Sequence, residues 1–389
     1  MKPLVRPLVI FLAFGLLLLG LAYLVPLQVP YYQDFSVSYF TERGLLQGIS
    51  IYDYPAQLEF VAAQTPAGFN FFPYPYPPWY ALTTLFLGWF PIQVAARAWF
   101  FLNISMLSLS VWFLTPNLQI LRRGLAILAA LMFVPALGLI FVGQYSAPVL
   151  LGAALFVHAA RHERPTLVAL ALLLLTFKPH IGGFLFLAGF FWLVWRRAPF
   201  ALRALRLTLA GGMLMLAIGF LADPAWPLTW LQSLARYRDL PGVQTCGLCA
   251  SLPGWLARQV TGRSSTAEAA LFGLLLALPV VALLFTRYRS CLRDPFILMS
   301  MSAILTLMLD PYLLNYDYIL LLIPLSWLVL RLPWPSLLIY LLSWTELILG
   351  RGQVLGLLSS ALLAFGLMLF LLASRIDSPL NEAYNQLEN

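Results

Sequence analysis

Asp34 is the first residue of this sequence whose position suggests chemistry. It lies in a polar stretch, residues 26–76, that follows the first long apolar run. A carboxylate near a membrane–water boundary is a candidate general base, because partial desolvation raises its pKa toward the working pH. The alternatives are an ordinary solvated loop acid or an N-cap for a helix over residues 35–46.

Lys178 is the second such residue. Lys178 and Lys2 are the only lysines, and Lys178 lies between two apolar segments, directly before Pro179 and His180. An ionisable residue at membrane depth is a functional candidate, and an ammonium in a pocket of low dielectric constant suits a phosphate. The alternative is a lysine that reaches toward the interface. We expect His180 either to assist or to cap the next helix.

Three further groups of polar residues are expected on the same side. The proline- and tyrosine-rich run at 72–80 is typical of an aromatic belt or of rings that border a sugar, and the turn at 143–146 is either a simple turn or a ligand contact. The acidic turn at 310–317 is either Asp-Pro turn chemistry or part of a site. The candidate residues in these groups are Tyr74, Tyr76, Trp79, Gln144, Asn315 and Asp317.

Composition determines which elements must position these residues. The chain has 389 residues, of which 61% are hydrophobic and 10% charged, against about 25% charged in soluble proteins. This composition predicts an all-α polytopic membrane protein that forms a single integral membrane domain over residues 1–389. The net charge of +8 comes from short basic clusters between apolar segments, which is the positive-inside pattern and not a nucleic-acid surface.

The charge clusters favour about twelve crossings, with both termini cytoplasmic and the segment 77–90 excluded as a half-helix at the outer surface. The first apolar run is interpreted as a retained span, and a cleaved signal peptide is the competing interpretation. The predicted outer loops are 26–76 and 223–262, with amphipathic helices that lie at the interface. The tail at 375–389 is predicted to be cytoplasmic.

Sequence motifs for other chemistries are missing. There is no P-loop, GxGxxG, HExxH or zinc-ligand spacing, so no metal or cofactor is expected. Cys246 and Cys249 form a CxxC in the second outer loop, for which a local disulfide is favoured over metal or redox chemistry.

The order of the motifs resembles glycosyltransferase family 87, within the GT-C superfamily of polytopic glycosyltransferases. One span precedes a long outer loop that opens with Asp-Phe at Asp34, followed by YPYPP, by GQ at Gln144 and by KP at Lys178. The resemblance implies a GT-C-like helical fold whose outward-facing cavity takes a polyprenyl-phosphate sugar, chiefly mannose, and a lipid-linked or glycan acceptor, without a nucleotide sugar. It matches Asp34 to the catalytic aspartate and Lys178 to the lysine of the KP motif. Actinobacterial members have histidines in the turn that corresponds to 310–317, where this chain has Asn315, Tyr316 and Asp317.

The resulting hypothesis is an inverting transferase in the cell membrane with its active site on the extracytoplasmic side. Asp34 would be the base, and Lys178, His180 and Gln144 would hold the donor phosphate. Tyr74, Tyr76, Trp79, Asn315 and Asp317 would contact sugar, lipid or acceptor. The alternatives are a transporter or flippase for a lipid-linked saccharide and a non-catalytic subunit of an envelope assembly.

Overall fold

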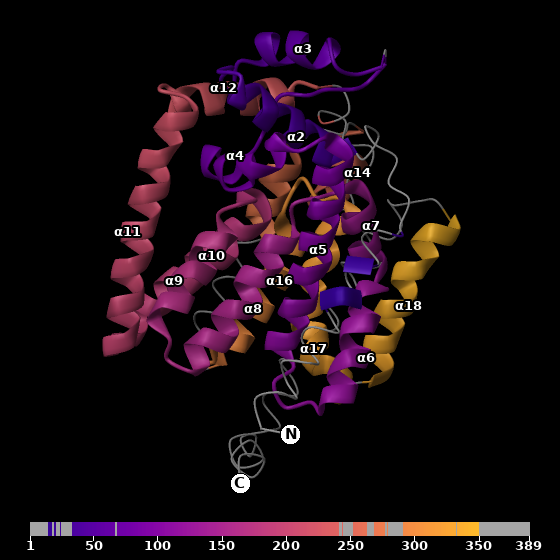
Figure 1. Ribbon diagram of the computed structural model, residues 1–389. Helices are drawn as coiled ribbons and strands as arrows, with labels where there is room; N and C mark the ends of the chain where they lie inside the picture. The colour runs from indigo at the N-terminus through magenta and orange to yellow at the C-terminus, as the bar shows by residue number, and fades with distance from the viewer. Residues whose placement is uncertain are drawn as a thin grey trace.

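The computed structural model is helical, and no strand occurs in the residues that it describes (Figure 1). These are residues 15–17, 19–20, 24, 33–66, 68–240, 243, 252–262, 268–276, 278, 291–331 and 333–349. Cys246, Cys249 and the tail at 375–389 lie outside the described residues. The helices are α2 (Gln33–Leu46), α3 (Tyr54–Ala62), α4 (Pro78–Thr84), α5 (Ile92–Leu114), α6 (Ile120–Leu131), α7 (Val134–Val142), α8 (Ala147–Arg161), α9 (Pro165–Leu175), α10 (Pro179–Arg196), α11 (Pro199–Ala222), α12 (Trp226–Arg238), α14 (Leu252–Thr261), α16 (Pro295–Leu309), α17 (Leu322–Arg331) and α18 (Pro333–Leu349), with 3₁₀ turns η1 (Leu85–Trp89), η2 (Cys291–Arg293) and η3 (Asn315–Leu321).

Proline starts many of these helices. It occupies one of the first two positions of α7, α8, α9, α10 and α11, among others. A proline there costs no hydrogen bond, because the first N–H groups of a helix have no partner within the helix. Two helices also have a side-chain cap: Asp53 accepts from the backbone N–H of Ala56 in α3, and Asp294 accepts from Phe296 and Ile297 in α16. The sequence therefore fixes many of the helix starts locally.

Two of the described helices, α5 with 23 residues and α11 with 24, are long and apolar enough to cross a membrane. The pair α6 and α7 makes a third candidate span, bent by 64° at its break. This agrees with a membrane protein, whereas the twelve crossings stay a prediction. The segment 77–90 forms only α4 and η1, of seven and five residues, which is too short to cross. A single candidate span, α5, then joins the predicted first outer loop to the basic cluster at Arg122.

Both predicted outer loops contribute helices to the same end of the molecule. In Figure 1, α2, α3 and α12 lie together at the top, above the bundle formed by α5, α8 and α16. An aromatic core holds this layer: the side chains of Phe35, Tyr80, Trp99 and Tyr145 are at most 2% exposed. Each large buried apolar side chain contributes about 1.5–3 kcal/mol. This packing fixes the start of α2, and therefore Asp34, against the helix bundle.

Candidate active site

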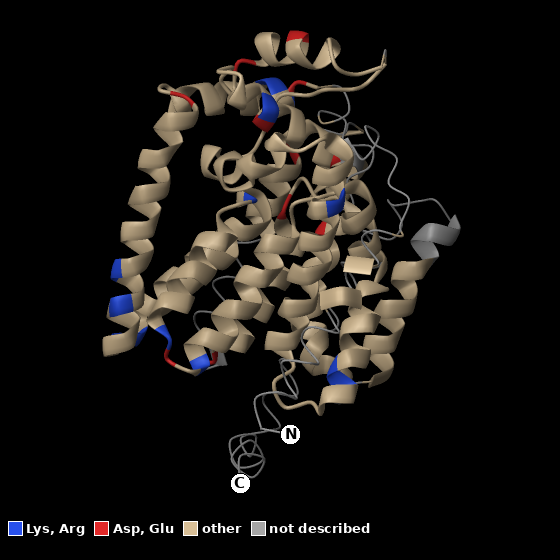
Figure 2. Cartoon of the chain, viewed as in Figure 1, with Lys and Arg blue, Asp and Glu red and all other residues tan. Residues whose placement is uncertain are grey.

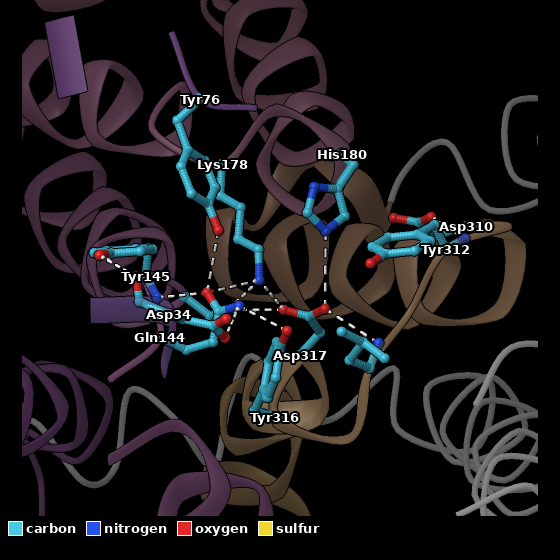
Figure 3. Close-up of polar contacts among 12 residues, drawn as sticks. Asp34, Tyr76, Gln144, Tyr145, Lys178, His180, Asp310, Tyr312, Tyr316 and Asp317 are labelled. Carbon is cyan, nitrogen blue, oxygen red and sulfur yellow. Dashed lines mark hydrogen bonds and ion pairs between the residues drawn. The ribbon is translucent and has the colours of Figure 1, made fainter. Parts of the chain in front are cut away.

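Asp34 lies in the first turn of α2 and points into a cluster of polar side chains (Figure 3). The adjacent Phe35 is buried in the aromatic core. The hydroxyl of Tyr145 donates to the backbone carbonyl of Asp34 at 2.9 Å, and Gln144 Nε2 donates to Asp34 Oδ2 at 2.8 Å. The carboxylate therefore has a side-chain partner from the turn between α7 and α8. Neither an ordinary solvated loop acid nor an N-cap describes this arrangement.

Gln144 is at the centre of the cluster. Gly143 ends α7 with a left-handed backbone, φ 75°, which glycine adopts without steric cost, and this turn aims the Gln144 side chain at Asp34. Gln144 Nε2 also donates to the hydroxyl of Tyr316 at 2.6 Å, while its Oε1 accepts from the backbone N–H of Tyr145 at 2.7 Å. Both N–H donors of the amide are therefore used within the protein, and none is left for a donor phosphate in this conformation.

Lys178 is the cation of the cluster, and its side chain is only 2% exposed. It directly precedes Pro179, the first residue of α10, and lies three residues after the end of α9 at Leu175. Its Nζ donates to Asp317 Oδ1 at 2.6 Å, to Ser146 Oγ at 2.9 Å and to Gln144 Oε1 at 3.3 Å. It also lies 4.7 Å from the centroid of the Tyr316 ring. The three N–H groups of the ammonium thus each have an oxygen partner.

Asp317 is the partner of Lys178 and is fully buried. Its Oδ1 also accepts from the hydroxyl of Ser146 at 2.7 Å, and its Oδ2 accepts from the backbone N–H of Leu314 at 3.3 Å. His180 Nε2 lies 3.8 Å from Oδ2. Removing one partner of a buried ion pair leaves an uncompensated charge, so Lys178 and Asp317 hold each other in place across 139 residues of sequence.

Burial raises the pKa of Asp34 from its ordinary value of 3.8 to about 6. The positive charge of Lys178 and the hydrogen bond from Gln144 act against this rise. A carboxylate with a pKa near 6 is ionised at neutral pH and takes up a proton more readily than an ordinary aspartate does. The environment therefore gives Asp34 the properties of a general base.

The rim of the cluster is formed by His180 and by two tyrosines from opposite loops. The His180 side chain is 32% exposed, and its ring lies 6.1 Å from that of Tyr312. The hydroxyls of Tyr312 and Tyr237 are 3.0 Å apart. Since Tyr237 belongs to α12, the second outer loop reaches the same place as the turn at 310–317.

The structure thus brings together six residues that the sequence singled out: Asp34, Tyr76, Gln144, Lys178, His180 and Asp317 (Figure 3). The hydroxyl of Tyr76 contacts the cluster by donating to Gln144 Oε1 at 3.4 Å.

The other three predicted residues have no polar contact with this cluster in the described part of the chain. Tyr74 is buried and touches Tyr76 with its ring. Trp79 packs against Trp226 of α12, with ring centroids 5.6 Å apart. Asn315 starts η3. Contacts of Tyr74, Trp79 and Asn315 with a substrate stay predictions. The same holds for Asp317, which is fully buried in this conformation.

Sequence reasoning missed the hydrogen-bonding roles of Tyr145, Ser146 and Tyr316. Tyr145 and Tyr316 are each adjacent in sequence to a residue that was predicted, and Ser146 lies two residues after Gln144 in the same turn, so this proximity was the available signal. As for metals, no group of three or more His, Cys, Asp or Glu side chains that could hold an ion occurs in the described ranges.

Comparison with known proteins gives one result. The sequence model of glycosyltransferase family 87 matches residues 74–311, which is more than half of the chain and includes Gln144, Lys178 and His180. Asp34 and Asp317 lie outside the matched segment, and the fold brings them to it. No curated protein and no solved structure matches the chain. The match, together with the apolar helices, shows a membrane glycosyltransferase: the chain belongs to glycosyltransferase family 87.

Proposed function

We propose that this glycosyltransferase moves a sugar, mannose in the first instance, from a polyprenyl-phosphate donor to a lipid-linked or glycan acceptor, with inversion at the anomeric carbon. The observation that carries the proposal is the joint contact of Asp34 and Lys178 with Gln144, at 2.8 and 3.3 Å. A base and a cation on either side of one amide match the two needs of such a displacement, a proton acceptor and a partner for the leaving phosphate.

In the reaction, Asp34 takes the proton of the acceptor hydroxyl. The acceptor oxygen then forms a bond to the anomeric carbon from the face opposite the phosphate. The bond between that carbon and the phosphate oxygen breaks, and polyprenyl phosphate leaves with the electron pair. The pKa of Asp34, raised by burial to about 6, supports its role as base.

Lys178 and His180 are the proposed partners of the leaving phosphate. Because the ammonium of Lys178 already has three oxygen partners, a phosphate must replace one of them, and the contact to Gln144 at 3.3 Å is the longest. His180 needs no such exchange, since its side chain is 32% exposed. Asp317 then has the role of holding Lys178 in position, in addition to the acceptor contact predicted from sequence.

The distribution of charge supports a multi-pass protein of the cell membrane with this site on the extracytoplasmic side. Figure 2 shows most acidic residues of the described part in the upper half of the molecule, whereas most basic residues gather at the lower end. Arg122 belongs to the first turn of α6, and Arg203 and Arg206 to the first two turns of α11. Cytoplasmic loops carry the excess of arginine and lysine. A lipid-phosphate donor suits an outer site, because it brings its own activated bond across the membrane.

The test is the donor requirement. The purified chain in lipid vesicles is given labelled polyprenyl-phosphate mannose or labelled nucleotide-linked mannose, with a membrane lipid extract as the source of acceptors. We expect labelled product only from the lipid-linked donor, and an inverted anomeric centre by NMR. Transfer from the nucleotide sugar alone, or a product with retained configuration, would overturn the proposal.

A further inference from the structure

A second group of charged side chains surrounds a cavity at the opposite end of α10. This helix begins directly after Lys178 and has 18 residues, ending at Arg196, so its two ends are about 27 Å apart. The cavity has a volume of about 280 Å³ and is lined by Trp192, Trp195, Arg196 and Arg293. We call it the α10 cavity. It lies about one hydrocarbon thickness of a bilayer from the Asp34 cluster.

Both arginines of the α10 cavity are placed over tryptophan rings. The guanidinium of Arg196 is 5.5 Å from the centroid of the Trp192 ring, and that of Arg293 is 5.9 Å from the centroid of the Trp195 ring. Trp192 Nε1 also donates to the backbone carbonyl of Arg293 at 3.0 Å, which joins α10 to η2. A guanidinium placed over an aromatic face keeps its N–H groups available for an anion in the plane of the fork.

The lining of this cavity carries positive charge without a matching acid. Among the described residues no carboxylate forms an ion pair with Arg196 or Arg293. Asp294, the acid next to Arg293 in sequence, contacts Arg161 at 3.4 Å and caps the N-terminus of α16. Two exposed guanidinium groups therefore line one cavity, and no acid of the described residues neutralises them.

An apolar stripe leads along α10 toward this cavity. Leu187, Phe191 and Val194 are 50%, 60% and 44% exposed, and their spacing of four and three residues puts them on one face of the helix. Phe191 lies one turn before Trp195, whose ring the guanidinium of Arg293 covers, so this face offers a surface for acyl chains that leads to the Trp195 side of the cavity. This combination distinguishes a lipid from a free phosphate ion, which would use the arginines and not the stripe.

We propose that the α10 cavity binds the phosphate headgroup of an anionic phospholipid, whose acyl chains lie along the stripe of Leu187, Phe191 and Val194. Basic pockets between helices near the membrane surface bind such headgroups, and an exposed tryptophan such as Trp195 is typical of that depth. The site is distinct from the Asp34 cluster, and it does not depend on the donor that the enzyme uses.

The test uses the full chain purified in a nonionic detergent. Short-chain phosphatidylglycerol, phosphatidylcholine and sodium phosphate are added separately at matched ionic strength. Binding is followed by native mass spectrometry and by the shift in thermal unfolding. We expect phosphatidylglycerol to bind preferentially. The double variant R196Q/R293Q should weaken this binding roughly thirtyfold, about fivefold for each arginine. The control R203Q/R206Q removes two exposed arginines of the neighbouring α11 that do not line the cavity, and it should leave this binding nearly unchanged.

Each other outcome overturns the proposal. Equal losses in the two double variants would mean diffuse attraction and no site. Equal stabilisation by sodium phosphate would mean a site for a free anion, and equal binding of the two phospholipids would remove the role of the headgroup charge.

Should R196Q/R293Q fail to fold, Phe191→Ala provides the second test. Its exposed side chain can be truncated without loss of core packing, and the variant should bind phosphatidylglycerol several-fold more weakly with an unchanged response to phosphate.

Discussion

Gln144 joins Asp34 to Lys178: its Nε2 donates to Asp34 Oδ2 at 2.8 Å, and its Oε1 accepts from Lys178 Nζ at 3.3 Å. The two charges are thus connected without forming a direct ion pair. Lys178 instead pairs with Asp317 at 2.6 Å. A direct ion pair with Lys178 would lower the pKa of Asp34. Because Lys178 pairs with Asp317 instead, burial has the larger effect on Asp34, and the pKa of this carboxyl rises to about 6. This division of partners makes the three side chains a functional unit.

The first prediction concerns Asp34. Since the base acts when ionised, kcat/KM for sugar transfer should fall as the pH decreases through about 6. Asp34→Asn removes the base and should lower transfer about 10²- to 10⁴-fold, while binding of the lipid donor persists. Transfer rates between pH 5 and 8 and retention of labelled donor by the purified protein measure the two effects. Undiminished turnover by the variant would exclude Asp34 as the base.

The second prediction concerns Gln144. Gln144→Leu removes a hydrogen bond that favours the ionised form of Asp34, so the pKa of that carboxyl should rise and the acidic limb of the pH profile should move above 6. The loss of rate should therefore be larger at pH 6 than at pH 8. Gln64→Leu is the matched control, because Gln64 lies in the segment 26–76 that also contains Asp34, and its side chain donates to the backbone carbonyl of Phe60, away from the cluster. An acidic limb unchanged in Gln144→Leu would remove the positioning role.

The third prediction separates the stability of the Lys178–Asp317 pair from its function. Lys178→Met leaves a buried carboxylate without its cation and should cost about 3–5 kcal/mol of unfolding free energy. Replacing both residues, in Lys178→Met with Asp317→Leu, should recover much of the stability but not the transfer activity.

Thermal unfolding in detergent and the transfer assay together measure these two outcomes. Arg238→Met, which removes the partner of Asp239 in an exposed pair, is the control and should shift stability by less than about 1 kcal/mol. If the double variant transferred sugar at the normal rate, the cation would have no part in the reaction.

Much of the site could be predicted from sequence because rare polar residues stand out against apolar segments. Lys178 is one of two lysines, and Asp34 directly precedes a buried aromatic run. The ion pair could not be predicted in the same way, because no spacing rule connects residues 139 positions apart in a helical bundle. One physical signal did exist. A carboxylate at the start of an apolar segment, as Asp317 is, needs a cation nearby, and Lys178 was the natural candidate.

For the fold, too, features that depend on neighbouring residues could be predicted from sequence, and contacts between distant segments could not. Helix starts follow from proline and aspartate, and the exclusion of 77–90 as a crossing follows from the basic cluster at Arg122. Two other features depend on tertiary packing, which the periodicity of the sequence does not encode. They are the 64° bend between α6 and α7 and the contact between Tyr237 of α12 and Tyr312. Sequence therefore identified the elements, and packing decided which of them meet.

Glu42 is a second buried acid of α2, two turns beyond Asp34, and the proposed reaction does not use it. Thr84 Oγ1 lies 2.5 Å from Glu42 Oε1 and 3.0 Å from the backbone carbonyl of Tyr80. Thr84 is the donor in both contacts and shares its one proton between these two acceptors. The contact to Glu42 ties α2 to α4 and acts against the rise in the pKa of Glu42 that burial causes. Burial nevertheless raises the pKa of Glu42 from 4.5 to about 8.

The fourth prediction follows from this raised pKa. Because the folded protein holds the proton more tightly than the unfolded chain does, the stabilisation is fully present below pH 4.5 and is lost as the pH rises through about 8. Thermal stability should therefore decrease across that window, by about 1.4 kcal/mol for each unit. Glu42→Gln, whose amide oxygen can still accept from Thr84, should fold and should flatten this slope. Asp53→Asn, at an exposed acid of the same outer loop, should leave it unchanged. If Glu42→Gln retained the full slope in unfolding scans from pH 5 to 8, Glu42 would not hold this proton.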